Sequence, residues 1–225
     1  MGTLSIVATP IGNLGDITLR AIETLRNADA ICCEDTRVTS KLLARYEISG
    51  KQLIRSDEKM EATAAKKVIE LLEEGKRVAL VTDAGTPGIS DPGSRLVARV
   101  REFAPEATIE AIPGPSALTA ALSIAGLESG EFTFLGFLPH KKGRQTMLKE
   151  IGASKRTIVV YESPHRIMKL LGELGEYIAI NRTISIGREL TKMHEEFLRG
   201  TAPELLTVLT QKPEKQRGEF VVIIE

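Results

Sequence analysis

The first 125 residues alternate short apolar runs with longer stretches in which apolar residues recur every three or four positions. Apolar runs at residues 4–8, 30–33, 52–55, 77–81 and 108–111 are predicted strands. Nearly continuous apolar runs are typical of strands whose two faces are both covered by helices. The longer stretches have the spacing of amphipathic helices. Because strand alternates with helix, the sequence predicts a doubly wound α/β layer with parallel strand pairing.

After residue 125 the pattern changes. Residues 126–131 are a predicted linker, and the predicted strands that follow lie at 132–138, 157–161, 182–186, 196–199 and 219–224. Because only one helix separates the last two strands, we expect them to be antiparallel rather than a βαβ unit. The sequence thus predicts two domains, an N-terminal α/β domain at 1–125 and a C-terminal α+β domain with a mixed sheet at 132–225. A capping box, Thr201 with Glu204, marks a helix start in the second domain.

Composition places the chain among globular proteins with a proper core. Hydrophobic residues make up 42% and charged residues 27% of the chain. No apolar run approaches the roughly 20 residues needed to span a bilayer, and the N-terminus lacks the basic region of a signal peptide. Cys32 and Cys33 are adjacent on a predicted strand, so their side chains point to opposite faces and we expect two buried thiols. We therefore expect a cytosolic protein that does not contact a membrane.

Three loops rich in glycine and proline follow predicted strands of the first domain. They read TPIGNLGD at 9–16, TDAGTPGISDPG at 82–93 and IPGPSA at 112–117. In open α/β sheets, ligands bind beyond the carboxyl ends of the strands. None of the loops matches the glycine patterns that hold dinucleotides or nucleoside triphosphates. Unless they are only structural turns, the loops favour a ligand with a cation and ribose hydroxyls over a polyphosphate.

Several motifs together resemble one family. TPIGNLGDIT, CEDTR, TDAGTPGISDPG, PGPSA, FLGFLP, YESPHR, GRELTKMHEE and RGEFV occur in the order seen in bacterial small-subunit ribosomal RNA cytidine 2′-O-methyltransferases, which belong to the tetrapyrrole-methylase superfamily. The resemblance covers essentially the whole chain from residue 3. It implies two α/β domains with S-adenosylmethionine in the cleft between them, and a homodimer. It also implies methylation of a cytidine ribose in the decoding region, with the assembled small subunit as the expected partner.

The resemblance also assigns cofactor-binding positions. The first loop supplies a proline and the second loop wraps the methionine and ribose portions, while a small Ser–Ala pair and the end of a second-domain strand complete the set. These positions are Pro10, Asp83, Ala84, Gly85, Gly88, Ser116, Ala117, Tyr161 and Glu162.

Catalysis and RNA binding require further charged groups. A ribose 2′-hydroxyl is a poor nucleophile at neutral pH, so we expect a base or a hydroxyl-orienting group. The catalytic candidates are Glu34, Asp35 and Glu162, with Arg37 as a clamp. The chain has a net charge of zero, but a basic run at 139–156 holds six Lys and Arg residues against one Glu. The RNA-binding candidates are Lys141, Lys142, Arg144, His165, Arg166, Arg188 and Lys192.

Structural explanations for the same residues stay open. Glu34 could end a strand, Asp35 and Arg37 could form a local ion pair, and the basic run could be a solvated face. Ser163 and Pro164 predict a helix start with His165 and Arg166 exposed in its first turn. Arg188, Glu189 and Lys192, if helical, could only brace one another.

Two other functions stay open as well. No histidine has metal-ligand spacing with another His or Cys, so no metal is expected. A small-molecule methyltransferase of the tetrapyrrole type is the alternative enzyme, although the charged EDTR and ESPHR motifs do not favour a corrin-like ligand. A non-catalytic module that binds the cofactor or RNA during ribosome assembly would bind without turnover.

Overall fold

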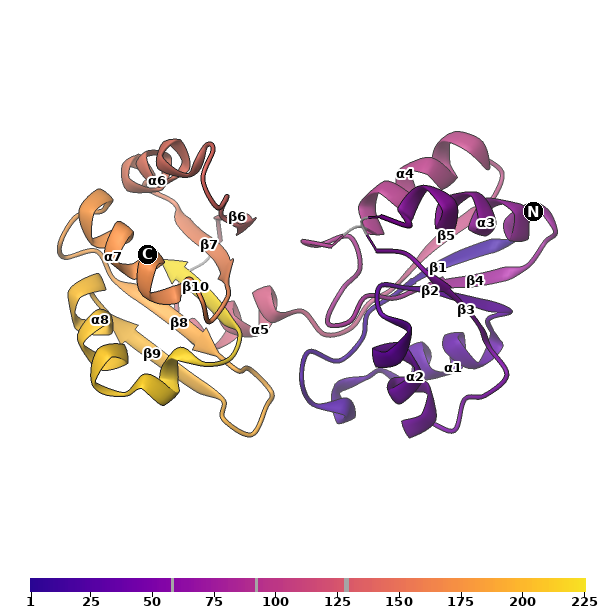
Figure 1. Ribbon diagram of the computed structural model, residues 1–225, viewed down its shortest axis with the longest axis horizontal. Coiled ribbons are helices and arrows are strands. Elements are labelled where there is room, and N and C mark those ends of the chain that lie inside the picture. The colour runs from indigo at the N-terminus through magenta and orange to yellow at the C-terminus, as the bar shows by residue number, and fades with distance from the viewer. Residues whose placement is uncertain (58, 92, 128–129) are drawn as a thin grey trace. The chain divides into compact units, whose positions relative to one another are not determined.

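Figure 1 shows the computed structural model of the chain, which describes residues 1–57, 59–91, 93–127 and 130–225. The chain forms two compact units, Met1–Ser116 and Ala117–Glu225, and each contains a five-stranded sheet. Among the described residues, no helix has both the length and the apolar character to cross a membrane.

The division between the units differs from the predicted linker. It falls before helix α5 (Ala117–Ala125), whereas the sequence pattern placed it after this helix. The physical reason is that α5 packs against strands β8 (Ile184–Arg188) and β10 (Phe220–Ile224) of the second unit. Residues 128 and 129 of the predicted linker lie outside the described residues.

The first unit has the predicted doubly wound architecture. Its strands are β1 (Thr3–Val7), β2 (Ala30–Cys33), β3 (Gln52–Arg55), β4 (Arg77–Leu80) and β5 (Thr108–Ile112). Its helices are α1 (Leu19–Asn27), α2 (Thr36–Arg45), α3 (Glu61–Glu73) and α4 (Gly93–Phe103), with a short 3₁₀ turn η1 (Leu14–Asp16). All strand pairs are parallel, in the order β3-β2-β4-β1-β5. The predicted parallel sheet is confirmed.

Helices cover both faces of this sheet, which explains the continuous apolar strands. Figure 1 shows α3 and α4 on one face and α1 and α2 on the other. Along β2, Ala30 and Cys32 belong to the core on the α3–α4 side, and Ile31 and Cys33 to the core on the α1–α2 side. The two cysteines are buried free thiols, as predicted, and burial raises the pKa of Cys32 to about 12.

The second unit has the predicted mixed sheet. Besides β8 and β10 its strands are β6 (Phe132–Phe137), β7 (Thr157–Glu162) and β9 (Glu196–Gly200), in the order β6-β7-β10-β8-β9. Only β6 and β7 are parallel; the other neighbours are antiparallel. Besides α5, its helices are α6 (Arg144–Ala153), α7 (Ile167–Tyr177) and α8 (Ala202–Gln211), followed by the 3₁₀ turn η2 (Pro213–Gln216).

The expected relation between the last two strands is wrong. β9 and β10 each pair antiparallel with β8, so they run in the same direction with β8 between them. The connection through α8 is long enough to pass over one strand, and the local sequence does not reveal which strand lies between. The predicted capping box is confirmed, since Thr201 N donates to Glu204 Oε2 at 2.8 Å.

One main core stabilises the second unit. Side chains of α6, α7 and α8 pack against one face of the sheet, including alternate residues Phe220, Val222 and Ile224 of β10. Figure 1 shows α5 on the opposite face. Alternation along β10 thus buries both faces of this strand and accounts for its five consecutive apolar residues.

Candidate functional site

The loops after β1 and β4 lie side by side where the strand order of the first sheet reverses. The chain passes from β1 outward to β2 and β3, returns to β4 beside β1, and then adds β5 on the far side of β1. Ligands of open α/β sheets bind at such switch points. Here Thr9 N donates to Gly85 O at 2.9 Å, and Gly85 N donates to Thr9 O at 3.1 Å. The Thr9 hydroxyl donates to Thr82 O at 3.0 Å, which fixes the two loops together.

The loop after β5 joins the same surface. The Thr86 hydroxyl donates to Pro115 O at 3.2 Å. A Cβ placed on Gly85 would lie 3.4 Å from Ile11 Cγ2 and 3.8 Å from Pro115 O, so three loops meet at this glycine. The three glycine- and proline-rich loops predicted from the sequence therefore meet at one surface of the first unit, which is the candidate cofactor site. Its cofactor candidates include the buried Pro10, the exposed Ala84 and the half-buried Ser116.

The β4–α4 loop needs its glycines for conformation. Gly85 and Gly88 have φ values of +87° and +86°, which side-chain-bearing residues rarely adopt. Gly88 N donates to both carboxylate oxygens of Asp91 at 2.9 Å, and Gly93 N donates to Asp91 Oδ1 at 2.8 Å. Asp91 therefore closes the loop onto the first turn of α4.

Two half-buried carboxylates stand at the ends of β2 and β4. Asp83 Oδ1 accepts a hydrogen bond from Asp35 N at 3.1 Å, and Glu34 Oε2 accepts one from the Thr82 hydroxyl at 3.1 Å. Burial raises the pKa of Glu34 and also the pKa of Asp83. A carboxylate with a raised pKa is a better proton acceptor than an ordinary one. Of the predicted catalytic carboxylates in the first unit, Glu34 thus has the environment suited to proton transfer.

Asp35 has a different role. Its side chain caps helix α2 by accepting from Arg37 N at 2.8 Å, and its Oδ2 lies 2.6 Å from Arg37 Nη2. Hydrogen bonds from Arg37 hold the pKa of Asp35 well below its usual range. The Arg37 side chain is 86% exposed. Asp35 and Arg37 therefore form the local ion pair that was the alternative interpretation of these residues. The lowered pKa makes Asp35 a poor base.

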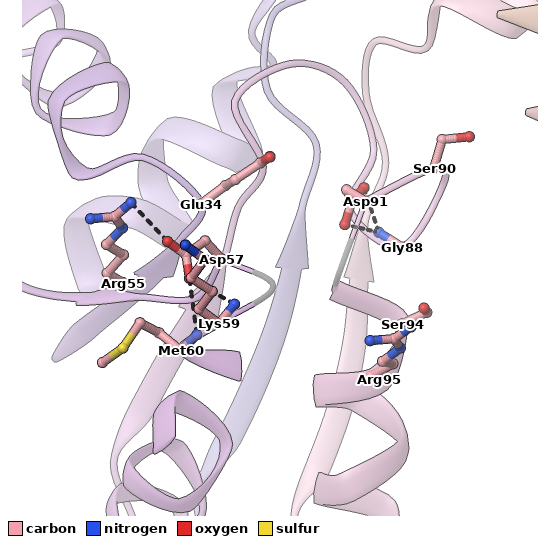
Figure 2. A pocket seen from close by; sticks show the side chains of 10 residues that line it. All are labelled: Glu34, Arg55, Asp57, Lys59, Met60, Gly88, Ser90, Asp91, Ser94 and Arg95. Atoms are coloured by element: carbon pink, nitrogen blue, oxygen red, sulfur yellow. Dashed lines mark hydrogen bonds and ion pairs between the residues drawn. The ribbon is translucent and has the colours of Figure 1, made fainter. Parts of the chain in front are cut away.

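A pocket of about 950 Å³ lies next to this site in the first unit. Figure 2 shows its lining residues in two groups on opposite sides. One group follows β2 and β3 and consists of Glu34, Arg55, Asp57, Lys59 and Met60. The other belongs to the β4–α4 loop and the start of α4 and consists of Gly88, Ser90, Asp91, Ser94 and Arg95.

Only Glu34 and Gly88 of the pocket were predicted as site residues. Arg55, Lys59 and Arg95 were missed. A signal for them exists in the sequence, because Arg55 ends a strand of the parallel sheet, Lys59 follows it closely, and Arg95 lies in the first turn of a helix that follows a glycine-rich loop.

The cofactor candidates of the second unit lie at the end of β7 and the start of α5. The Tyr161 hydroxyl accepts from Leu118 N at 3.2 Å. Its ring makes edge contacts with Phe134 and Phe137, with centroid distances of 4.9 Å and 5.6 Å. Ala117 is the first residue of α5, so β7 and α5 bring Ala117 and Tyr161 close together.

Glu162 belongs to a buried charged cluster. Glu162 is 1% exposed, its Oε1 lies 2.7 Å from Arg166 Nε, and its Oε2 lies 3.9 Å from Arg144 Nη2. Among the described residues, Glu162 Oε2 has no hydrogen-bond partner. Arg144 Nη2 also lies 2.6 Å from Glu173 Oε2, and Arg144 Nη1 donates to Pro139 O at 3.0 Å.

This cluster corrects two expectations. Arg144 was predicted as an exposed RNA contact, whereas its side chain is 3% exposed and its guanidinium is paired with Glu173 and Pro139 O. The helix predicted from Ser163 and Pro164 begins later, at Ile167, after a turn. Arg166 is consequently partly buried and donates from Nη1 to Leu138 O at 2.9 Å.

Arg188 and Lys192 are also engaged within the protein. The segment after β8 is not helical, and the Arg188 guanidinium donates to three carbonyl oxygens, those of Arg217, His194 and Glu214, at 2.7, 3.1 and 3.2 Å. The Lys192 ammonium lies 2.8 Å from carboxylate oxygens of both Glu189 and Glu219. Arg188 was predicted to contact RNA, whereas it is 8% exposed, and Lys192 pairs with Glu189 as in the alternative interpretation.

The remaining RNA candidates, Lys141, Lys142 and His165, are exposed. They are the residues of the predicted RNA-binding set whose charge or ring is presented to solvent. Within the part of the chain that the structure describes, no group of three or more His, Cys, Asp and Glu side chains could hold a metal ion.

The sequence is similar to a known protein family and to curated proteins. The model of the family described as Tetrapyrrole (Corrin/Porphyrin) Methylases matches residues 3–206. A curated protein of Thermotoga maritima, named Ribosomal RNA small subunit methyltransferase I, is 45% identical over 224 residues, which cover 100% of this chain and 98% of the relative. Proteins of the same name from Halalkalibacterium halodurans and Neisseria meningitidis serogroup B are 47% and 46% identical; the alignments cover 100% and 99% of this chain and 76% of each relative.

Solved structures share the fold at lower identity. The methyltransferase CobJ superposes with a TM-score of 0.72 at 21% identity, covering 100% of this chain and 94% of that chain. Uroporphyrin-III C-methyl transferase from Thermus thermophilus, complexed with S-adenyl homocysteine, has a TM-score of 0.68 at 16% identity, covering 99% and 97%. These likenesses establish a common architecture.

Proposed function

The chain belongs to the tetrapyrrole (corrin/porphyrin) methylase family, and we propose that it transfers a methyl group from S-adenosylmethionine to the 2′-oxygen of a cytidine ribose in small-subunit ribosomal RNA. One observation carries the choice of RNA: relatives about 45% identical over the whole chain are named ribosomal RNA small subunit methyltransferases. The cytidine and the 2′-oxygen rest on the resemblance of the EDTR, DAGTPGISDPG and ESPHR motifs.

The residues of the three-loop site fit S-adenosylmethionine. Backbone hydrogen bonds between Thr9 and Gly85 join the loops after β1 and β4, and a Cβ on Gly85 would sit where these loops meet the loop after β5. Glycine allows a ligand to approach the backbone closely. The Asp83 carboxylate, half-buried beside this surface, suits a ribose hydroxyl or the ammonium of the amino-acid tail. We propose that Pro10, Asp83, Ala84, Gly85 and Gly88 hold the cofactor.

The reaction places few chemical demands on the protein. The bound sulfonium supplies an activated methyl group that is transferred by in-line displacement, so the protein mainly aligns the reacting atoms. Glu34 is the residue we assign to the 2′-hydroxyl: it accepts the hydroxyl proton as the new oxygen–carbon bond forms. Burial raises the pKa of Glu34, which makes Glu34 a suitable proton acceptor. Hydrogen bonds from Arg37 lower the pKa of Asp35, which makes Asp35 a poor one.

Glu162 is not assigned to proton transfer. Its carboxylate is buried between Arg144 and Arg166, where it supports the end of β7. We propose that it positions Tyr161, whose hydroxyl and ring contacts lie within the same unit. Homodimer formation and action on the assembled subunit stay predictions from the resemblance.

The alternative of a tetrapyrrole substrate is weakened by the pocket. Six of its ten lining residues are charged, which suits phosphate and ribose groups better than an apolar macrocycle. A non-catalytic module would bind the cofactor or RNA without turnover.

A labelled-methyl transfer assay separates these functions. Purified protein is incubated with labelled S-adenosylmethionine and, in parallel, with naked small-subunit RNA, isolated small subunits or tetrapyrrole precursors. We expect label in RNA and the higher rate on isolated subunits. Label only in the tetrapyrrole, or no label with intact cofactor binding, would contradict the proposal.

A further inference from the structure

The pocket beside the three-loop site is lined by nine residues besides Glu34, and their chemistry indicates what it could bind. Its volume of about 950 Å³ lies in the range of ligand-binding cavities and is large enough for a nucleotide unit. Its two groups of side chains come from opposite sides, one after β2 and β3 and one from the β4–α4 loop and α4, as Figure 2 shows. The strand order places β2 between β3 and β4, so Glu34 stands at the middle strand.

The acidic side chains of the pocket are mostly committed to their own loops. Asp57 Oδ1 accepts from Lys59 N and Met60 N at 3.0 Å and 2.9 Å, and Asp57 Oδ2 lies 2.7 Å from Arg55 Nη2. Asp91 accepts from the backbone of the β4–α4 loop, as described above. These two carboxylates therefore shape the walls and leave little capacity to bind a cation.

Two of the three cationic side chains of the pocket, those of Lys59 and Arg95, are less committed, whereas Arg55 is paired with Asp57. Among the described residues, the Lys59 ammonium has no recorded ion-pair or hydrogen-bond partner. The Arg95 side chain is 75% exposed, and its one ion pair, with Glu61, measures 3.3 Å. Helix α3 begins after Met60, which lines the pocket, and the Asp57 carboxylate already accepts from Met60 N at this helix start. Two cations from opposite walls, Lys59 and Arg95, make a site for phosphate oxygens.

We propose that this pocket binds the phosphodiester backbone of the RNA strand beside the target nucleotide, with Lys59 and Arg95 contacting phosphate oxygens from opposite walls. The inference rests on the proposed function and specifies where the substrate lies. The cofactor candidates of the first unit follow β1, β4 and β5. The two phosphate-binding residues lie elsewhere, Lys59 after β3 and Arg95 on α4. Glu34, at the end of β2, then stands between the RNA backbone and the cofactor loops.

The test compares Lys59→Gln and Arg95→Gln with matched controls on α3, which follows Lys59, and on α4, which carries Arg95. Lys66→Gln removes an exposed cation further along α3, and Arg99→Gln removes one a single turn further along α4. Equilibrium binding of small-subunit RNA is measured at several salt concentrations in the presence of S-adenosylhomocysteine, which prevents turnover. Affinity for S-adenosylhomocysteine alone is measured for every variant.

We expect each pocket variant to bind RNA about three- to tenfold more weakly, and the slope of log affinity against log salt to fall by about 0.7 per lost contact. The controls and all cofactor affinities should match the wild type. Pocket variants that bind RNA like their controls, in a protein that methylates RNA, would overturn this inference and leave the proposed function intact. A wild-type protein that binds RNA through these residues but transfers no methyl group would overturn the proposed function instead.

Discussion

Replacing Arg144 by methionine tests the structure against the simplest interpretation of the basic run at 139–156. The run looks like an RNA-binding face, but the Arg144 guanidinium is buried, lies 2.6 Å from Glu173 and 3.9 Å from Glu162, and donates to Pro139 O. The methionine side chain is unbranched, apolar and shorter, and it carries no charge. The substitution leaves the Glu162 carboxylate, 1% exposed, with Arg166 as its one remaining ion-pair partner among the described residues.

The expected cost follows from the loss of one partner of a buried charged network. Removing such a partner typically costs about 3–5 kcal/mol, because a buried charge loses its compensation. For a unit of this size, 1 kcal/mol corresponds to about 4 °C in Tm. The second unit of Arg144→Met should therefore unfold more than about 10 °C below the wild-type temperature.

Thermal unfolding followed by circular dichroism and calorimetry provides the measurement. Lys149→Met, which removes an exposed cation on the same helix α6, is the matched control and should leave Tm unchanged. Adding Glu173→Gln to Arg144→Met should recover part of the loss, because the two side chains interact directly. An Arg144→Met protein with wild-type Tm and weakened RNA binding would refute the assignment of Arg144 to the interior.

Three further variants test the site. Gly85→Ala should lower Tm by a few degrees, because φ is +87° there, and should also weaken S-adenosylmethionine binding in calorimetric titration; Gly75→Ala, at φ +79° with open space around it, should share only the loss of stability. Equal cofactor affinity in the two variants would remove Gly85 from the site. Glu34→Gln should lower kcat about 10²- to 10⁴-fold and abolish the acidic limb of the pH–rate profile, which reports ionisation of a carboxyl whose pKa is raised. The raised pKa of Glu34 means that this residue stabilises the fold below its unfolded-state pKa, and that this stabilisation is lost as the pH rises through its folded-state pKa. At pH 7, Glu34→Gln should therefore be no less stable than the wild type. A large loss of stability at pH 7 would mark Glu34 as structural. Lys141→Glu with Lys142→Glu should weaken RNA binding and flatten its salt dependence without changing cofactor affinity, and unchanged binding at all salt concentrations would identify a solvated face.

The architecture was predictable because its signal is local. Most strands of the first sheet contain a short apolar run bounded by turn residues, and the helices between them have a clear apolar stripe. The three loops were predictable for the same reason, since parallel strands bring their carboxyl ends to one edge. The hydrogen bonds between Thr9 and Gly85 and between Thr86 and Pro115 realise that expectation.

What the sequence concealed depends on partners far along the chain. Arg144 lies on the buried side of α6 together with Leu148 and Ile151, and this helical spacing can be seen in the sequence. Its ion-pair partner Glu173 lies on another helix, which the sequence does not reveal. The pocket combines Lys59 after β3 with Arg95 on α4, and local patterns do not show that these two residues line one pocket from opposite walls.

The relation of β9 and β10 was likewise hidden. Both strands and the helix between them are evident from the sequence, but their relative direction depends on β8 lying between them in the sheet. Local propensity does not encode which strand occupies that place.

The most direct measurement of the central claim locates the transferred methyl group. Small subunits are incubated with the protein and labelled S-adenosylmethionine, and the RNA is hydrolysed in alkali, which cleaves after every nucleotide that has a free 2′-hydroxyl. The account predicts a single alkali-resistant dinucleotide that carries the label on the ribose of a cytidine. Label released as an ordinary mononucleotide methylated on its base, or RNA without label, would contradict it.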